Sequence, residues 1–456
     1  MRRIRGIACC AVASAFLAAC AGRGQALPSA SDLSLSQEAR AHVEKLAQFS
    51  GPVTGSYPNG PLVMDARGNL YGTAATGGSF VCNGVGCGTV FELTRSNGSA
   101  YVLRTLHKFG ANQDGDPEGG LIVGSDGSLY GTTYFGPPNE HGVTGTAFKL
   151  TPTGSGYQES ILYTFEGGAD GNAPFGSLVA DPSGALYGVT IYGGSVECDC
   201  GTVYKLTPSP SGYTHTVIYR FRGNAAGDGH TPSSPLIIDD RGDLYGVTTV
   251  GGSRTACSYN GCGIAFELVP SRAGYSEKIL HAFEGHGDGA YPSGALTLAS
   301  GKLYGATLIG GAACSDSNGC GTIFSLSPTA SGRTERVLYA FRGTANGQND
   351  GISPNGGLVV GSTGQIFGTT ELDGMHECLH RLLSCGTIFA LTPGGSGYSE
   401  STLYVFKNSV NGDVPEPGWA LGSDGTFYGT TAGGGDLQCY DSLPGCGTVY
   451  TVAFPR

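Results

Sequence analysis

Twelve cysteines beyond the first twenty residues could form crosslinks or hold a metal, because they fall in six close pairs. A zinc site needs four converging ligands, whereas these pairs are spread along the chain. Paired cysteines in an exported chain instead predict disulfides that fix short loops. The tight spacing of Cys198 and Cys200 leaves open whether these two pair with each other. The expected pairs are Cys82 with Cys87, Cys198 with Cys200, Cys257 with Cys262, Cys314 with Cys320, Cys378 with Cys385, and Cys439 with Cys446.

Aspartate recurs beside glycine at six places, where it could bind a cation or shape a turn. Asp-Gly is a strong turn dipeptide because the carboxylate accepts hydrogen bonds from nearby backbone, so a structural role ranks first. Calcium bound through oxygen ligands is the second interpretation, although the spacing matches no EF-hand or nonapeptide pattern. We otherwise expect no cofactor and no metal. The six remain candidates for a binding face: Asp114, Asp170, Asp228, Asp288 and Asp350, each before a glycine, and Asp413, which follows one.

The pentapeptide His376-Glu377-Cys378-Leu379-His380 matches the H-E-x-x-H pattern of zinc peptidases. That chemistry needs both histidines on one face of a helix, with a further ligand and a water-activating glutamate. Here the pentapeptide lies in a loop between two expected strands. We interpret it as an ordinary loop, with an adventitious metal site or a peptidase as weaker alternatives. The sequence has no G-x-S-x-G elbow and no P-loop, so no catalytic residue is assigned.

Trp419, the only tryptophan, occupies a position where we expect glycine or serine from the repeats described next. Its indole could line a channel as a stacking platform or fill a gap in the packing. The packing role ranks first, and Trp419 stays a candidate for the binding face.

Four short segments recur seven times and must position these residues. We name them strands a to d in chain order. Strand a follows a proline that lies four residues before a leucine, with Pro417 and Leu421 expected in the last copy. Strand b contains Leu-Tyr-Gly, strand c begins Gly-Thr, and strand d ends Leu-x-x-Phe or a close variant. Each segment is rich in β-branched or aromatic residues between turn residues, which predicts β-strands.

Four strands in every 57 to 63 residues predict the blade of a β-propeller, and seven copies predict an all-β, seven-bladed ring. The last copy has no strand d after Gly447-Thr448-Val449-Tyr450, whereas residues 42–49 supply a d-like strand before the first copy. Pairing this N-terminal strand with the last blade would close the ring and remove an exposed sheet edge. An open β-array or separate domains is the alternative.

The composition agrees with this fold class. The 456 residues include 80 glycines and 23 prolines. Each glycine costs a helix roughly 1 kcal/mol, which excludes long helical bundles and coiled coils. The hydrophobic share of 39% excludes a disordered chain.

The repeat resembles the GloVer repeat of "choice-of-anchor" tandem-repeat proteins. The resemblance rests on Leu-Tyr-Gly-Thr-Thr at residues 129–133 and Gly-Thr-Val-Tyr-Lys-Leu-Thr-Pro at residues 201–208, and it covers residues 40–456. It implies a bacterial, exported protein held by an anchor, and it implies no particular activity.

The N-terminus supplies the expected anchor. Arginines precede an apolar run, residues 7–19, which is too short to span a bilayer and typical of a signal peptide. Leu17-Ala18-Ala19-Cys20 resembles the lipobox of bacterial lipoproteins, which implies cleavage before Cys20 and acylation of that residue with palmitate-type chains. A signal peptide cut elsewhere, or an uncleaved anchor, is the alternative. Ala21 follows, without aspartate, which favours the outer membrane of a Gram-negative cell.

We therefore expect a signal peptide over residues 1–19, a flexible tether over residues 20–40 and a propeller over residues 41–456. Loss of the three arginines in residues 1–19 takes the formal net charge from −11 to −14, so nucleic acid is not an expected partner.

In a propeller the b–c and d–a loops share one face, here called the loop face. The b–c loops are long and rich in cysteine pairs, and varied loops on a stable scaffold usually carry binding. The first hypothesis is a lipid-anchored binding or adhesion scaffold for glycans or another exposed polymer. The alternatives are a propeller hydrolase or lyase acting on polysaccharide, and an envelope module that docks another protein.

Overall fold

The computed structural model describes residues 41–454 apart from short gaps. The expected signal peptide, Cys20, the tether, Cys378 and the H-E-x-x-H pentapeptide therefore lie outside the described residues. The gaps are residues 80–81, 83–85, 96–99, 111–113, 138–143, 196, 254–256, 258–259, 312–313, 315–318, 331, 344–348, 373–384, 396, 408–410, 437–438 and 440–444.

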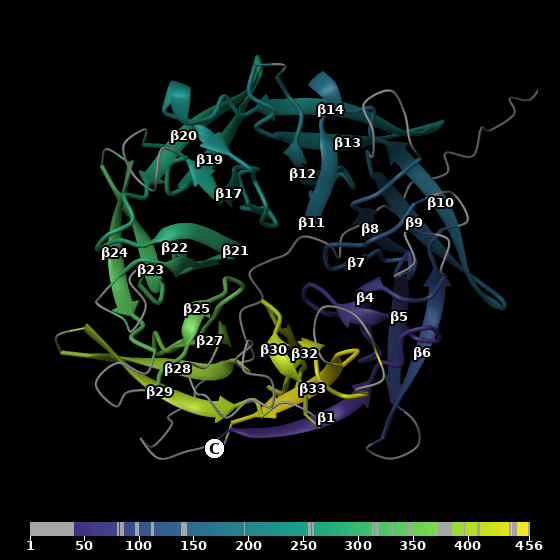
Figure 1. The fold of residues 1–456 in the computed structure, drawn as a ribbon. Helices are drawn as coiled ribbons and strands as arrows, with labels where there is room; N and C mark the ends of the chain where they lie inside the picture. The colour runs from purple at the N-terminus through teal and green to yellow at the C-terminus, as the bar shows by residue number, and fades with distance from the viewer. Residues whose placement is uncertain are drawn as a thin grey trace, which may run out of the picture.

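Seven antiparallel sheets follow one another around a common axis, which confirms the predicted seven-bladed propeller (Figure 1). Each sheet has strand a innermost and strand d outermost, in the order a-b-c-d. The described residues contain no α-helix, and their only helical turns are two 3₁₀ turns, η1 (Gly168–Asp170) and η2 (Asn224–Ala226). No described helix is long and apolar enough to cross a membrane.

The first four blades hold residues 56–282. Blade 1 contains β2 (Ser56–Pro58), β3 (Val63–Met64), β4 (Leu70–Thr76), β5 (Thr89–Arg95) and β6 (Tyr101–Lys108). Blade 2 contains β7 (Ile122–Val123), β8 (Leu129–Thr133), β9 (Thr146–Thr153) and β10 (Gly156–Thr164). Blade 3 contains β11 (Asn172–Ala180), β12 (Leu186–Tyr192), β13 (Thr202–Ser209) and β14 (Gly212–Arg220). Blade 4 contains β15 (Gly229–His230), β16 (Ile237–Ile238), β17 (Leu244–Thr248), β18 (Val250–Gly251), β19 (Ile264–Ser271) and β20 (Gly274–Ala282).

The last three blades complete the ring. Blade 5 contains β21 (Ala290–Ala299), β22 (Lys302–Ile309), β23 (Thr322–Thr329) and β24 (Gly332–Ala340). Blade 6 contains β25 (Ile352–Pro354), β26 (Val359–Val360), β27 (Ile366–Leu372), β28 (Thr387–Gly394) and β29 (Gly397–Val405). Blade 7 contains β30 (Asp413–Pro415), β31 (Ala420–Leu421), β32 (Phe427–Gly433), β33 (Thr448–Ala453) and, from the N-terminal side, β1 (His42–Gln48).

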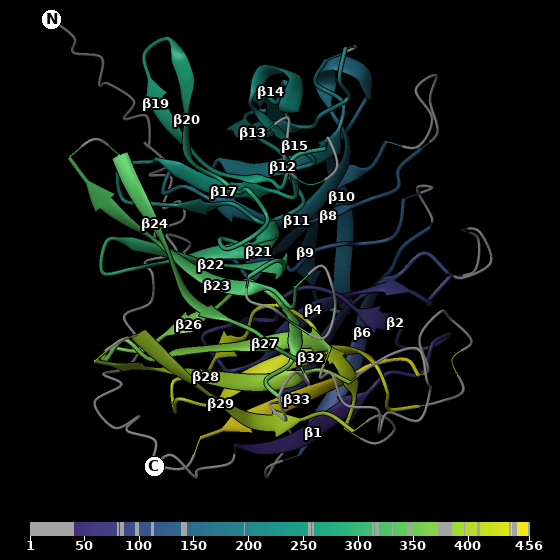
Figure 2. The same ribbon diagram turned by 60° about the vertical axis from the view of Figure 1, so that its left-hand side comes forward.

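Strand β1 closes the ring as predicted. It pairs antiparallel with β33, from His42 opposite Ala453 to Gln48 opposite Thr448. The two strands lie side by side in both views of the ribbon (Figure 1; Figure 2). Blade 7 thereby gains its strand d, and the last strand c has no open edge.

The core is divided among the junctions between blades. At each of the seven junctions a phenylalanine that ends strand d meets an aromatic ring of strand c in the next blade, edge to face. All of these rings are buried. The pairs are Phe49–Phe91, Phe109–Phe148, Phe165–Tyr204, Phe221–Phe266, Phe283–Phe324, Phe341–Phe389 and Phe406–Tyr450, with centroids 4.9–5.2 Å apart.

The glycine of each Leu-Tyr-Gly segment makes room for this aromatic ring. A Cβ on Gly72 would lie 2.5 Å from the Phe91 ring and 2.8 Å from Leu62. Strand b can therefore sit against the core only where that residue has no side chain.

Candidate functional site

The loop face is built from the ends of strands b and d and the starts of strands c and a. Its loops bond to one another, as when the Gly194 amide donates to the Gly168 carbonyl at 2.7 Å. Five of the six predicted disulfides are formed within the described residues, with Cα–Cα distances of 5.1–5.6 Å. They join Cys82 with Cys87, Cys198 with Cys200, Cys257 with Cys262, Cys314 with Cys320, and Cys439 with Cys446.

The sixth predicted disulfide, Cys378 with Cys385, involves a residue outside the described part. The second cysteine of every pair is buried directly before the glycine that begins strand c. Cys320 and Cys446, the second cysteines of the pairs in blades 5 and 7, have no exposed surface. Each disulfide therefore ties its loop to a fixed point at the start of strand c.

Each crosslinked loop also joins the next blade. The carbonyl of Cys87 accepts a 2.8 Å hydrogen bond from the amide of Asp116, the residue before the repeat proline Pro117. The second cysteines of the other pairs accept in the same way, from Thr231 to Cys200 at 3.0 Å, Tyr291 to Cys262 at 2.9 Å, Ser353 to Cys320 at 3.0 Å, Val414 to Cys385 at 3.3 Å, and Tyr57 to Cys446 at 3.1 Å.

All six donors have positive φ values, between 48° and 62°. This conformation costs a non-glycine residue of order 1–3 kcal/mol. The disulfides therefore brace strained backbone at the inner edge of the loop face.

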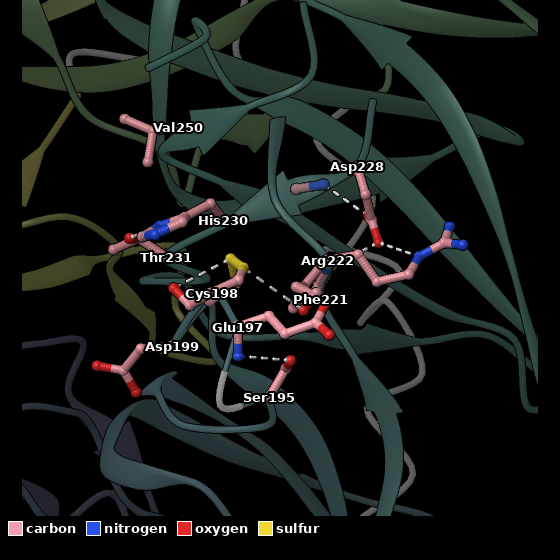
Figure 3. The surroundings of a disulfide bond; sticks show 12 residues. Ser195, Glu197, Cys198, Asp199, Phe221, Arg222, Asp228, His230, Thr231 and Val250 are labelled. Atoms are coloured by element: carbon pink, nitrogen blue, oxygen red, sulfur yellow. Dashed lines mark hydrogen bonds and ion pairs between the residues drawn. A yellow bond between two sulfur atoms is a disulfide. The ribbon is translucent and has the colours of Figure 1, made fainter. Parts of the chain in front are cut away.

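Cys198 and Cys200 do pair with each other (Figure 3). Cys200 is buried, whereas Cys198 is half-buried and lies between the exposed residues Glu197 and Asp199. The His230 imidazole and the two sulfurs both lie close to Gly223, and burial lowers the pKa of the imidazole. An imidazole with a lowered pKa is neutral at neutral pH, so it adds no positive charge beside the sulfurs.

The first five predicted aspartates lie one per junction and fold back onto their own d–a loops. The backbone amide just after the strand-d phenylalanine donates to the carboxylate in each case. The bonds run from Gly110 to Asp114 at 3.2 Å, Glu166 to Asp170 at 2.9 Å, Arg222 to Asp228 at 3.0 Å, Glu284 to Asp288 at 3.0 Å, and Arg342 to Asp350 at 3.0 Å. Asp114, Asp228 and Asp350 are also almost fully buried. The five carboxylates hold turns, which is the role ranked first from the sequence.

Asp413, the sixth predicted aspartate, does not occupy the position of the other five in its d–a loop. Asn411, which precedes Gly412, takes the aspartate position and donates to the Tyr404 hydroxyl at 3.2 Å. Asp413 is 3% exposed, and burial raises the pKa of its carboxyl to about 6.

The expected register of the last strand a is also wrong by two residues. The repeat proline packs against the glycine that begins strand c of the preceding blade. In the last copy this proline is Pro415 and not Pro417, since the Pro415 ring lies so close to Gly386 that a Cβ on that glycine would clash with it. Trp419 therefore takes the place of the repeat leucine, not of a glycine or serine, and Leu421 lies two residues further on. The Trp419 indole lies over Gly429 and donates to the Tyr450 hydroxyl at 3.0 Å. It fills the core of blade 7, as the packing interpretation predicts.

The residue after each repeat proline lies near the start of the innermost strand of its blade, close to the axis of the ring. Asn59 of blade 1 donates to the Glu118 carboxylate of blade 2. The charge of Glu416 in blade 7 reaches Glu118 and raises its pKa, although their blades are not adjacent. Residues of non-adjacent blades come within electrostatic range of each other only on the innermost strands, close to the axis. The seven residues in this register, here called the mouth ring, are Asn59, Glu118, Phe175, Ser233, Ser293, Asn355 and Glu416.

The mouth ring lies around the axis on the side of the loop face, because strands a begin there and strands b end there. Glu371, near the end of β27, joins it from blade 6, and its charge raises the pKa of Glu416. The acidic side chains thus come from blades 2, 6 and 7, whereas blades 4 and 5 contribute serines. The acidic residues are therefore concentrated on one part of the mouth ring, although the seven blades have nearly the same fold.

Burial sets the protonation of this cluster. It raises the pKa of Glu118 well above its usual range, and the nearby charges of Asp116 and Glu416 raise it further. Burial, with a contribution from Glu371, raises the pKa of Glu416 to about 8, and burial raises that of Asp116 to about 6. Burial also raises the pKa of Glu371. At neutral pH the mouth therefore offers carboxylic acid donors as well as carboxylate acceptors.

Aromatic surface lies beside these acids. Tyr134 follows β8, and its amide donates to the Asp116 carbonyl at 2.8 Å. Burial and then the neighbouring Tyr192 raise the pKa of Tyr134 to about 12. Tyr192 ends β12 on the loop face and is 39% exposed. Mixed donors and acceptors next to an exposed aromatic ring suit a ligand rich in hydroxyl groups.

Within the described residues, no group of three or more histidine, cysteine, aspartate or glutamate side chains is arranged to hold a metal ion. The mouth ring was missed from the sequence, although a signal for it exists. The column after the repeat proline mixes glutamate with neutral residues, and the misplaced proline of the last copy hid Glu416 from that column.

The family model of the Gloeobacter/Verrucomicrobia repeat matches residues 141–379 and 258–454. A comparison with curated proteins finds no match. Among solved structures, a putative 6-phosphogluconolactonase from Bacteroides uniformis is 13% identical, with 79% of this chain and 88% of that chain covered and a TM-score of 0.48. The PQQ-bound aldose sugar dehydrogenase of Streptomyces coelicolor is 13% identical, with 74% and 95% covered and a TM-score of 0.41. At these values neither likeness carries information about ligand or activity.

Proposed function

The chain belongs to the Gloeobacter/Verrucomicrobia repeat family, and we propose that it is an exported, lipid-anchored binding scaffold. Its ligand is a glycan or another hydroxyl-rich polymer outside the cell membrane, held by the loop face over the mouth of the channel. The five disulfides are consistent with export, because such bonds persist in oxidising compartments.

One observation carries this proposal. The residues that depart most from the repeat, Glu118, Glu371 and Glu416 with Tyr134, converge at one mouth of an otherwise regular ring. Packing alone does not require carboxyl groups there, since the serines of blades 4 and 5 occupy the same register. Partly protonated carboxyls and aromatic rings are the groups that bind sugars through hydrogen bonds and stacking.

A glycan array probed with the full mature chain tests the proposal. We expect binding to a defined set of polysaccharides, weakened at least ~10-fold in Glu118→Ala with Glu416→Ala, because each hydrogen-bonding group removed from a buried site costs about 1–3 kcal/mol. The matched control is Asp240→Asn, which removes one negative charge from an exposed a–b turn on the opposite face. Binding that both variants leave unchanged would place the ligand elsewhere.

A second candidate function is polysaccharide hydrolysis or cleavage at the same mouth. It is favoured by the raised pKa of Glu416, since a carboxyl that stays protonated near neutral pH can act as a general acid. Turnover assays on each polymer bound in the array separate the two functions. A chain that binds without shortening the polymer is a scaffold, and one that releases products is an enzyme. A chain that captures only an envelope protein after crosslinking is a docking module.

A further inference from the structure

The junctions between blades contain buried polar clusters that neither the repeat core nor the proposed function uses. Each junction has two such positions on its strands d. The first is two residues before the phenylalanine of one blade and faces the d–a loop. The second is six residues before the phenylalanine of the next blade, and it faces both the first position and the loop. Between blades 3 and 4 these positions hold Tyr219 of β14, Asp228 of the loop and Glu277 of β20. The Tyr219 hydroxyl lies 2.8 Å from Asp228 Oδ2 and 2.6 Å from Glu277 Oε2.

The two hydrogen bonds require one more hydrogen than the Tyr219 hydroxyl and two ionised carboxylates contain. A phenol has one hydrogen and can donate it to one carboxylate only, yet both oxygen–oxygen distances are hydrogen bonds. Two ionised carboxylates cannot both be satisfied by that single hydrogen. One of the two carboxyl groups must itself be protonated and donate to the phenol oxygen.

The remaining contacts identify which carboxyl group carries the proton. Asp228 also accepts hydrogen bonds from the amide and Nε of Arg222, both at 3.0 Å, and from the amide of Gly229 at 2.6 Å. These donors stabilise the ionised form of Asp228. Glu277 has no such donors, and its Oε1 is buried without a partner among the described residues. Burial also raises the pKa of Glu277 to about 7, so the proton belongs to Glu277.

The junction between blades 5 and 6 repeats the same four residue types. Tyr339 lies 2.6 Å from Asp350 Oδ2, and the amide of Arg342 donates to Asp350 at 3.0 Å. Glu400 of β29 takes the position of Glu277, and its charge reaches Tyr339. Burial raises the pKa of Glu400 to about 8, although it also accepts a 2.9 Å hydrogen bond from Thr402.

We propose that Glu277 and Glu400 are protonated in the folded protein and stabilise the junctions between blades 3 and 4 and between blades 5 and 6. Loss of these protons in alkaline solution destabilises both junctions and the d–a loops at them. The charged and titratable groups that face Glu277 are Tyr219, Asp228 and Arg222. Those that face the second cluster are Tyr339, Asp350 and Arg342. In the first cluster the single arginine, Arg222, already pairs with Asp228, so ionising Glu277 leaves a buried negative charge uncompensated.

At the junctions between blades 1 and 2 and between blades 4 and 5, the glutamate position holds Glu159 and Glu335, which face His107 and His281 in place of a tyrosine. His215 takes the glutamate position between blades 2 and 3 and lies 3.1 Å from Asp170. At the two junctions that flank the ring-closing strand, the position holds Val43 and Leu103. The alkaline destabilisation is therefore local to part of the ring and does not act at its closure.

The raised pKa values of Glu277 and Glu400 determine how pH changes the stability of the folded protein. Because the folded pKa values exceed the ordinary value of 4.5, the stabilisation is lost as the pH rises through about 7 for Glu277 and about 8 for Glu400. Between about pH 5.5 and about pH 9, ionisation raises the unfolding equilibrium constant roughly 30-fold through Glu277 and roughly 250-fold through Glu400.

Thermal unfolding of the full mature chain at both pH values tests the proposal, with Glu277→Gln/Glu400→Gln as the variant. Glutamine keeps a donor for the tyrosine oxygen and cannot ionise, so the variant should match the wild type in acid and melt higher in alkali. Asp240→Asn, in an exposed turn, should behave as the wild type. An equal loss of stability in wild type and variant would overturn the proposal.

Infrared spectroscopy of the wild type provides a readout that does not need the variant to fold. The carbonyl stretch that Tyr219→Phe shifts in frequency should disappear between about pH 6 and about pH 9 in the folded protein, whereas the stretches of the protonated mouth carboxyls, Glu118 and Glu416, should not respond to that substitution. A folded protein at about pH 6 in which Tyr219→Phe shifts no carbonyl stretch would also overturn the proposal.

Discussion

Trp419 shows how one residue can depart from a repeat for reasons of packing. Blade 7 has Tyr450 where most blades have phenylalanine in strand c, and its buried hydroxyl needs a donor or an acceptor. The indole supplies a donor and also fills the space of the repeat leucine. Blade 3 has a tyrosine at the same place, Tyr204, with Leu178 opposite, so the tryptophan is not the only solution that the fold accepts.

Trp419→Leu should lower the free energy of unfolding by about 2–4 kcal/mol, because it leaves a cavity and removes the donor to the buried Tyr450 hydroxyl. Tyr450→Phe in the same chain should recover part of the loss, since it restores the leucine–phenylalanine pair of other blades. Denaturant titration measures both. A single variant as stable as the wild type would contradict the packing role.

The junction aspartates make a second prediction about residues. Most of their oxygens accept hydrogen bonds from backbone amides and neighbouring side chains, and among these five carboxylates only Asp114 Oδ2 is buried without a partner in the described residues, so few lone pairs remain for a cation. Melting temperatures in chelator and in millimolar calcium should agree. A rise of several degrees with calcium would show that the carboxylates are ligands.

At the scale of elements, strands b, c and d could be predicted from the sequence because each is a continuous run between turn residues. Strand a could be predicted only in outline. In blades 1, 4, 6 and 7 it is broken in two, as β2 and β3 in blade 1, whereas in blades 3 and 5 it is one strand with a register shift in its middle.

The predicted register of the last strand a was wrong for a related reason. Two prolines stand two residues apart, and both fit the apolar spacing along the chain. Only a contact between blades, the ring of Pro415 against Gly386, decides between them. The mouth ring depends on contacts of the same kind, since Glu118 and Glu416 lie about 300 residues apart in sequence.

Replacing Cys82 and Cys87 by serine should cost about 2 kcal/mol of stability, since this crosslink closes a short loop. The ring should survive, and the b–c loop of blade 1 should become the preferred site of proteolytic cleavage. Limited proteolysis with mass spectrometry, beside the intact chain, checks both statements. Cleavage in other blades first would mean that the disulfide does not brace its own loop.

For the whole molecule, ring symmetry and function are separate. The seven aromatic pairs repeat nearly unchanged around the axis, whereas the mouth ring and the junction clusters differ from blade to blade. Such a division leaves a stable scaffold on which side chains can vary at one face.

The expected anchor also belongs to this scale. Cys20→Ser should move the protein from the membrane fraction to the soluble fraction, because acyl chains on that residue are the only membrane attachment in our proposal. Fractionation with mass spectrometry of the N-terminal peptide measures it. A variant that stays with the membrane would point to a different anchor.

Closure of the ring by β1 is the claim on which the loop face, the mouth ring and the junctions all depend. Deleting residues 42–48 removes the partner of β33 and should expose that strand. Equilibrium unfolding of the deleted chain should show a large loss of stability and a broad transition without the cooperativity of the full chain. A deleted chain that unfolds at the same denaturant concentration and as sharply as the full one would contradict the closed propeller.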